Sequence, residues 1–203
     1  MLKTEILKIK GDWEEVVNDC RSTVGKGELG KEPSKSFKEK ILLAEHSPIR
    51  DIIVKWRWKN IKSWISVHWS RHKWECFIRS QRTDRTGVDR NKLPQDAPVD
   101  FIGSANCQHL IDTFRKRLCY QADRETRYYA EDFKCSLRPI EKEISDALVP
   151  NCVYRGGCPE LSPCGLWDRF VHWCESKKHV DVRTLSLLER YKLYNEYYYS
   201  TIS

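Results

Sequence analysis

The sequence predicts an α/β protein with a small, mostly antiparallel sheet and long helices, followed by a helical C-terminal extension. The first third of the chain contains two segments that are expected to form strands. In one, aliphatic and charged side chains alternate, and the other is rich in β-branched residues. The longest helical pattern follows at residues 104–133, where apolar side chains recur every three or four positions. After Pro150 the composition shifts towards Cys, Gly and Pro, so we expect one domain over residues 1–150 and an extension over residues 151–203.

The chain begins with a predicted strand at residues 2–10, where aliphatic and charged side chains partly alternate. A short helix is expected at residues 12–20. Glycine and proline then interrupt the pattern over residues 25–33, which predicts a loop. The GxG in this loop lacks the third glycine of a dinucleotide-binding turn, so an ordinary turn is favoured.

Three further elements follow in the first half of the chain. A helix is predicted at residues 36–45, with Ser36 as its N-cap. Residues 52–58 are rich in β-branched and aromatic side chains, which is typical of a strand. Ser63 is a suitable cap for a helix over residues 63–72.

The second half is predicted to be mainly helical. Residues 76–98 contain Gly, Pro and many basic side chains and are expected to be irregular. Ser104 is expected to open the long helix, and Pro139 lies beyond its end. A last amphipathic helix is predicted at residues 184–199.

Composition excludes several classes of protein. The 203 residues are 40% hydrophobic and 32% charged, which is enough apolar material for a folded core. No run of about 18 apolar residues occurs, so no membrane-spanning helix is predicted. The N-terminal residues do not resemble a secretion signal, so we expect a cytoplasmic protein whose nine cysteines are reduced or metal-bound. The formal net charge of +7 favours phosphate-bearing partners.

A basic cluster gives the strongest functional indication. Six potential cations fall within fifteen positions: Arg71, His72, Lys73, Arg79, Arg82 and Arg85. Such a run is either a solvated loop or a site for an anion, because close cations repel one another. Aromatic residues between the charges and the predominance of arginine favour phosphate recognition. The same composition also suits a groove for single-stranded nucleic acid.

The cluster resembles the signature of the flavin-dependent thymidylate synthases. That family carries Gln-Trp-x-Arg-His-Arg followed by Ser-x-Arg-Tyr. Here the corresponding stretches are His68-Trp69-Ser70-Arg71-His72-Lys73 and Ser80-Gln81-Arg82-Thr83.

Other motifs agree in order and spacing over about residues 40–135. They are Glu45-His46-Ser47-Pro48-Ile49-Arg50-Asp51, Arg90-Asn91-Lys92-Leu93-Pro94, Asn106, Arg117 and Gln121-Ala122-Asp123-Arg124-Glu125-Thr126-Arg127. Two departures occur: Arg50 and Asp51 replace the family's Glu and His, and a long segment before Arg90 is reduced to Thr83–Asp89.

The resemblance implies that the protein methylates dUMP to dTMP. Methylenetetrahydrofolate would supply the carbon and FAD, once reduced by NADPH, the hydride, in a homotetramer with active sites between subunits. Arg117 would be the catalytic residue, because a fixed cation stabilises charge that develops on the uracil oxygens. Substrate binding is expected from Ser80, Arg82, Arg90, His68 and Arg71. FAD binding is expected from Ser47, Arg71, His72, Lys73, Asn106 and Gln121.

Two other functions remain open. The departures from the family pattern are compatible with a related modification of a uracil nucleotide, such as hydroxymethylation. The second alternative is a relative of the enzyme that has no catalytic activity and serves as a nucleic-acid-binding or regulatory module.

The cysteines of the extension raise a separate question. Cys152, Cys158, Cys164 and Cys174, with His172 and Cys135, contain the residue types of a zinc site. Their spacings are wider than the usual pairs, so thiols packed as small apolar side chains are favoured and no metal is predicted.

Overall fold

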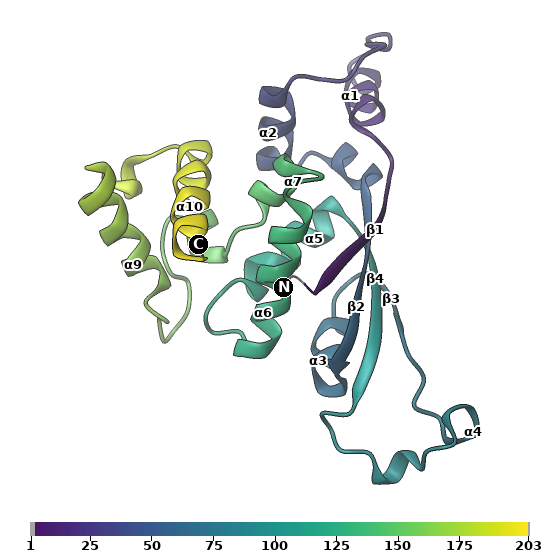
Figure 1. Cartoon of the computed structure of the whole chain (residues 1–203). Helices are drawn as coiled ribbons and strands as arrows, with labels where there is room; N and C mark the ends of the chain where they lie inside the picture. Colours follow the sequence, from purple (N-terminus) through teal and green to yellow (C-terminus); the bar gives the residue numbers. More distant parts are fainter. Residues whose placement is uncertain (1–2, 203) are drawn as a thin grey trace.

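A four-stranded antiparallel sheet forms the centre of the molecule (Figure 1). The computed structural model describes residues 3–202. The sheet has the order β1-β2-β4-β3. Its strands are β1 (Thr4–Lys10), β2 (Ile53–Lys62), β3 (Glu75–Ile78) and β4 (Pro98–Asn106). The predicted mixed α/β class with an antiparallel sheet is therefore confirmed.

Helices pack on one side of this sheet and continue beyond it (Figure 1). Those preceding residue 150 are α1 (Trp13–Ser22), α2 (Lys35–Ala44), the 3-10 helix η1 (Ser47–Asp51), α3 (Ser63–Ser70), α4 (Thr83–Thr86), the 3-10 helix η2 (Arg90–Lys92), α5 (Cys107–Arg117), α6 (Arg124–Leu137) and α7 (Lys142–Ala147). The extension contains α8 (Asn151–Arg155), α9 (Leu166–Trp173), the π-helical turn η3 (Cys174–Lys178), the 3-10 helix η4 (Val182–Thr184) and α10 (Leu187–Ile202).

Several early elements agree with the sequence prediction. Strands β1 and β2 and helices α1, α2 and α3 form where they were expected. Asp12 caps α1 in a reciprocal capping box with Glu15. The cap of α2 is Ser34, whose side chain accepts from the Phe37 amide, and not Ser36 as predicted.

The prediction for residues 104–133 was wrong in two respects. Ser104 lies inside strand β4, paired with Lys55 and Glu75, and opens no helix. The helical part is also divided into α5 and α6, because Asp123 accepts a hydrogen bond from the Thr126 amide and starts a new helix.

Residues 76–98 are also more ordered than predicted, because they begin within edge strand β3 and enter β4 at Pro98. Between these strands, residues 79–97 form an arm that carries α4 and projects from the sheet (Figure 1). Most side chains of this arm are exposed.

Aromatic side chains fill the main core. Trp56, Trp58 and Trp69 are fully buried. Trp56 lies over Gly103 of the neighbouring strand, where an added Cβ would stand 2.2 Å from the indole. Trp69 stacks on Trp74 with ring centroids 5.7 Å apart. Trp69 is therefore a core residue, and Trp74 is partly buried against the same core.

A second apolar cluster holds the extension together. It includes Val149, Val153, Phe170, Val182 and Tyr194. The start of this cluster next to residue 150 agrees with the proposed division into residues 1–150 and 151–203, which stays a prediction.

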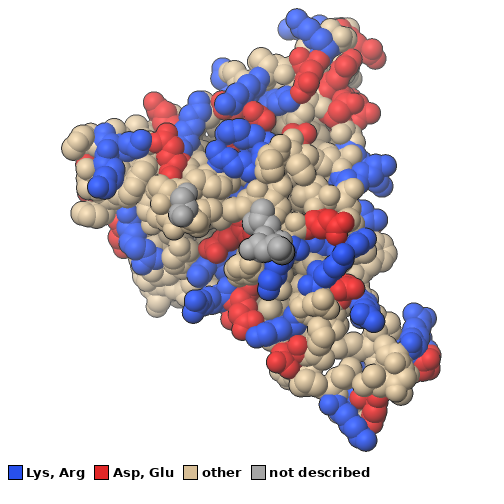
Figure 2. Space-filling view, viewed as in Figure 1, with Lys and Arg blue, Asp and Glu red and all other residues tan. Residues whose placement is uncertain are grey.

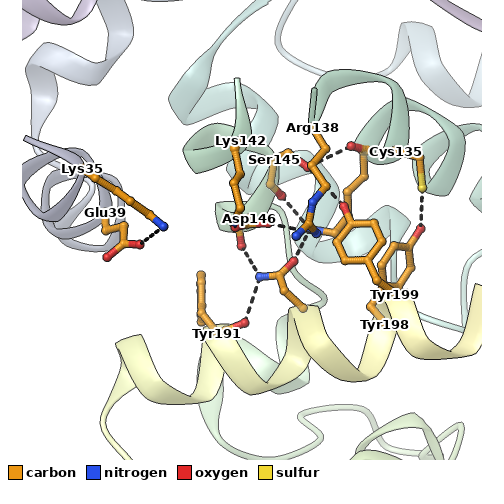
Figure 3. A network of polar contacts seen from close by, with 12 residues as sticks. Lys35, Glu39, Cys135, Arg138, Lys142, Ser145, Asp146, Tyr191, Tyr198 and Tyr199 are labelled. Carbon is orange, nitrogen blue, oxygen red and sulfur yellow. Dashed lines mark hydrogen bonds and ion pairs between the residues drawn. The ribbon is translucent and has the colours of Figure 1, made fainter. Parts of the chain in front are cut away.

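A polar network joins the extension to α6 and α7 (Figure 3). Lys134 of α6 is fully buried and donates to the Ser145 carbonyl at 2.6 Å and to Asn195 Oδ1 at 2.8 Å. Arg138 stacks on the Tyr199 ring at 3.8 Å. These contacts connect α10 to α6 and α7 through the buried Lys134 and Asn195 and the half-buried Arg138 and Tyr199.

Candidate functional site

The predicted catalytic arginine is held by two hydrogen bonds at the end of α5. Arg117 Nε donates to His72 Nε2 at 2.8 Å, and its terminal nitrogen donates to the His68 carbonyl at 3.0 Å. Its guanidinium also lies 5.9 Å from the centroid of the Trp69 ring. The guanidinium is therefore fixed by α3 and by the turn that follows α3.

This contact defines the protonation state of His72. Burial, together with the charges of Arg117 and Lys116, lowers the pKa of His72 to about 4. The imidazole is consequently neutral at neutral pH. Because arginine only donates, His72 Nε2 is the accepting nitrogen and Nδ1 carries the proton.

A cleft of about 480 Å³ lies beside this pair. One wall is the turn after α3, another is the face of α5, and the third comes from α8 of the extension. The lining residues are Arg71, His72, Lys73, His109, Asp112, Thr113, Arg115, Lys116, Asn151, Tyr154 and Arg155. The extension thus contributes directly to the cleft, a role that the sequence did not indicate.

One of the cleft arginines has a structural partner. Arg115 forms an ion pair with Glu45 at the end of α2, and its guanidinium lies 3.6 Å from the centre of the Tyr154 ring. Burial would raise the pKa of Glu45, but hydrogen bonds from Arg115 and Gln108 outweigh it and lower that pKa. Arg115 therefore joins α2, α5 and α8 and gives the cleft a rigid wall.

Four other cations give the cleft its positive character. The side chains of Arg71, Lys73, Lys116 and Arg155 are exposed along its rim. Their convergence supplies several donors for an anion such as a phosphate or diphosphate. Burial lowers the pKa of Arg117, and the positive charge of the neighbouring Arg71 lowers it further.

Three predicted substrate ligands lie elsewhere within the chain. Ser80, Arg82 and Arg90 belong to the arm, which Figure 1 shows projecting away from α5. Arg82 makes a bidentate contact with Asp84, at 3.0 and 2.7 Å. A single chain therefore does not bring these residues to Arg117.

Three predicted flavin ligands are also separated from the cleft residues. Asn106 caps α5 by accepting from the His109 amide at 2.9 Å, and Ser47 opens η1, which packs against α5. Asn106 lies at the opposite end of α5 from Arg117, about 16 Å away along the helix axis. Gln121 donates to the Ser162 carbonyl of the extension.

His68 has a clear structural contact. Its Nδ1 lies 2.9 Å from the hydroxyl of Thr126, which is buried on α6. The structure thus brings together Arg71, His72, Lys73 and Arg117, with His68 next to them. Sequence reasoning missed Lys116, Tyr154 and Arg155, because no local pattern indicates that α8 packs against α5.

The fold resembles enzymes that act on uracil nucleotides. A UMP/dUMP methylase, PolB, from Streptomyces cacaoi, bound with 5-bromo-dUMP, has a TM-score of 0.57 at 13% identity over 71% of this chain and 93% of its own. A flavin-dependent thymidylate synthase from Helicobacter pylori, complexed with FAD and dUMP, has a TM-score of 0.60 at 10% identity over 72% and 99%. No protein-family model and no curated protein match the chain. At these identities the likeness establishes the fold alone.

Within residues 3–202, no helix combines the length and apolar character needed to cross a bilayer.

Proposed function

We propose that this protein is a flavin-dependent enzyme that methylates dUMP to dTMP, with methylenetetrahydrofolate as carbon donor and NADPH as reductant. The observation that carries the proposal is Arg117, a guanidinium fixed by His72 and the His68 carbonyl beside a cationic cleft. The similarity of the fold to two enzymes solved with uracil nucleotides supports it.

The role of Arg117 follows from the chemistry of uracil. Carbon 5 becomes nucleophilic only when negative charge develops on the ring oxygens. A guanidinium that is already oriented stabilises this charge without having to reorganise, and loss of such a group typically lowers the rate by about 10²–10³. Since His72 is neutral, it orients Arg117 without adding a competing positive charge.

The cleft fits part of a flavin dinucleotide. The exposed cations Arg71, Lys73 and Lys116 suit a diphosphate. The neutral imidazole of His72 adds a hydrogen-bond donor, its Nδ1–H. A volume of about 480 Å³ is within the usual range for ligand sites. When bound and reduced by NADPH, the flavin would supply the hydride, while these side chains bind and orient it.

The remaining predicted ligands require a second subunit. Ser80, Arg82 and Arg90 stand on the projecting arm, so we propose that the arm reaches the Arg117 end of a neighbouring copy. Homotetrameric assembly with shared sites, as the resemblance implies, would complete a substrate pocket that one chain leaves divided. Ser47 and Asn106 would bind another part of the flavin at the opposite end of α5.

The first experiment is a visible spectrum of the purified protein, followed by a reaction with dUMP, methylenetetrahydrofolate and NADPH. We expect a flavin absorption band, release of the hydrogen at carbon 5 of dUMP, and a product with the mass of dTMP. Arg117→Ala should bind flavin and lose turnover by about 10²-fold or more. The matched control, Arg183→Ala, removes an exposed arginine of the extension and should remain active.

Other outcomes separate the alternatives. A product with the mass of a hydroxymethylated nucleotide would show that the protein catalyses hydroxymethylation and not methylation. A colourless protein that binds single-stranded DNA with strong salt dependence would favour the non-catalytic alternative. On the face shown in Figure 2, basic and acidic side chains are interspersed.

A further inference from the structure

Four cations around the candidate cleft have no acidic partner. They are Arg71, Lys73, Lys116 and Arg155. Among residues 3–202, no carboxylate forms an ion pair with any of the four, whereas Arg115 of the same cleft pairs with Glu45 and Asp112. Like charges that gather without a counter-charge repel one another, so this arrangement favours a bound anion.

The four cations stand on walls from different parts of the chain. Arg71 and Lys73 belong to the turn after α3, and Lys116 belongs to α5. Arg155 belongs to α8 and therefore comes from the extension. An anion in the cleft is consequently bounded by positive charge from the core and from the extension.

Two arginines of other helices hold α8 in place. The guanidinium of Arg115 lies 3.6 Å from the centre of the Tyr154 ring, and Arg190 of α10 donates to the Tyr154 carbonyl at 3.1 Å. The Arg190 guanidinium also packs against Gly156, where an added Cβ would stand 2.5 Å from one of its nitrogens. The backbone is thus fixed on both sides of Arg155.

The side chain of Arg155 is exposed and oriented by a single contact. Its Nε donates to Asn151 Oδ1 at 3.2 Å, one turn earlier on α8, and Asn151 lines the cleft as well. This contact uses one of the five N–H donors of the guanidinium. Within residues 3–202 its two terminal nitrogens have no other partner, so they are available to an acceptor in the cleft.

We propose that Arg155 binds the second phosphate of a diphosphate in the cleft, and that it makes the cleft select nucleotides with two linked phosphates over those with one. The first phosphate lies among Arg71, Lys73 and Lys116. A guanidinium suits this role because its planar fork donates to two phosphate oxygens at once. For flavins the inference rests on the proposed function, since FAD contains a diphosphate and FMN a single phosphate.

The selection follows from the placement of the charges. A cleft of about 480 Å³ has room for both phosphates and part of a nucleoside. A monophosphate among the three core cations makes no use of Arg155, whose exposed guanidinium then stays hydrated at no cost. A diphosphate adds charge-assisted hydrogen bonds to Arg155, which are about twice as strong as bonds between neutral groups. Removal of Arg155 therefore weakens the binding of diphosphates and leaves that of monophosphates unaffected.

Calorimetric titration with ADP, AMP, FAD and FMN tests the selection on the full-length protein, freed of bound flavin. The unaltered protein should bind ADP more tightly than AMP, and FAD more tightly than FMN, by about 10-fold or more in each pair. Arg155→Gln should weaken the binding of ADP and FAD by about 10-fold or more. The same variant should change the affinities for AMP and FMN by less than about 3-fold.

Two further variants serve as controls. Arg155→Lys keeps the charge but not the planar fork, so its affinity for ADP should lie between those of the unaltered protein and Arg155→Gln. Arg183→Gln removes another exposed arginine of the extension, which pairs with Glu175 and Asp181, and should bind all four nucleotides normally. Circular dichroism should show the same fold in every variant, because both side chains are exposed.

The outcomes separate this inference from the proposed function. Equal affinity of Arg155→Gln and the unaltered protein for ADP and FAD would overturn the role of Arg155, even if the protein is an active flavoenzyme. Equal weakening of ADP and AMP would overturn the selection. Binding of ADP that depends on Arg155, in a protein that does not bind FAD, would support this inference and refute the flavin. Failure of the unaltered protein to bind either ADP or FAD would overturn both.

Discussion

The buried amine of Lys134 should make the stability of this protein depend on pH. Burial lowers the pKa of Lys134 to about 7. The two acceptors around Nζ, the Ser145 carbonyl and Asn195 Oδ1, match the two hydrogens of a neutral amine. Replacement by methionine keeps much of the side-chain volume and removes the titrating group.

The sign and size of the effect follow from proton linkage. An exposed lysine in the unfolded chain has a pKa of about 10.4. Between these two pKa values the unfolded chain binds one proton more than the folded chain, so the free energy of unfolding rises with pH. From about pH 6 to about pH 9 the gain from Lys134 amounts to about 2.5 kcal/mol. Below about pH 7 the folded protein also binds this proton, and the gain is lost.

Urea denaturation at several pH values measures this contribution. The free energy of unfolding of the Lys134→Met variant should rise less with pH than that of the unaltered protein, by about 2.5 kcal/mol over this range. Lys192→Met, which removes an exposed lysine of α10, should follow the unaltered protein. Parallel pH profiles for Lys134→Met and the unaltered protein would refute a neutral buried amine.

Three further predictions test other parts of the structure. Arg117→Gln should raise the pKa of His72 above about 4 but leave it below 6.5, because burial is the larger cause; a histidine titration by NMR that shows no change would contradict the contact. Gly103→Ala should lower the free energy of unfolding by about 1–3 kcal/mol or more, because the new Cβ meets Trp56; urea denaturation measures this, and an unchanged midpoint would contradict the packing. Arg82→Ala and Arg117→Ala should each be inactive in the dUMP assay, whereas reassembled mixtures of the two should recover measurable turnover if subunits share sites. Mixtures as inactive as the separate variants would contradict the sharing of sites between subunits.

Local patterns predicted much of the sheet and the first helices. Strand β2 was evident because residues 52–58 are rich in β-branched and aromatic side chains. Strand β4 was missed because its inward positions include Gly103 and Ala105, small residues that weaken the two-residue period. The break between α5 and α6 was also missed, since α5 ends at Arg117 and α6 starts at the Asp123 cap without a proline or glycine between them to interrupt the periodic pattern.

The candidate site was less predictable because it depends on contacts between distant segments. The motifs indicated Arg117 and His72 separately, but nothing in the sequence reveals that one donates to the other. Arg115, Glu45 and Tyr154 come from three elements, and only the fold assembles them.

The two bonds that hold Arg117 have a consequence for ligand choice. A guanidinium that donates to both His72 and the His68 carbonyl cannot reorient towards a ligand that binds in a displaced position. A ligand whose acceptor atoms are displaced from the Arg117 guanidinium would leave that donor without a hydrogen-bond partner. An unpaired, desolvated donor carries a free-energy penalty. Rigidity at this one side chain would therefore make the protein intolerant of analogues with a shifted ring, even where the cleft has room for them.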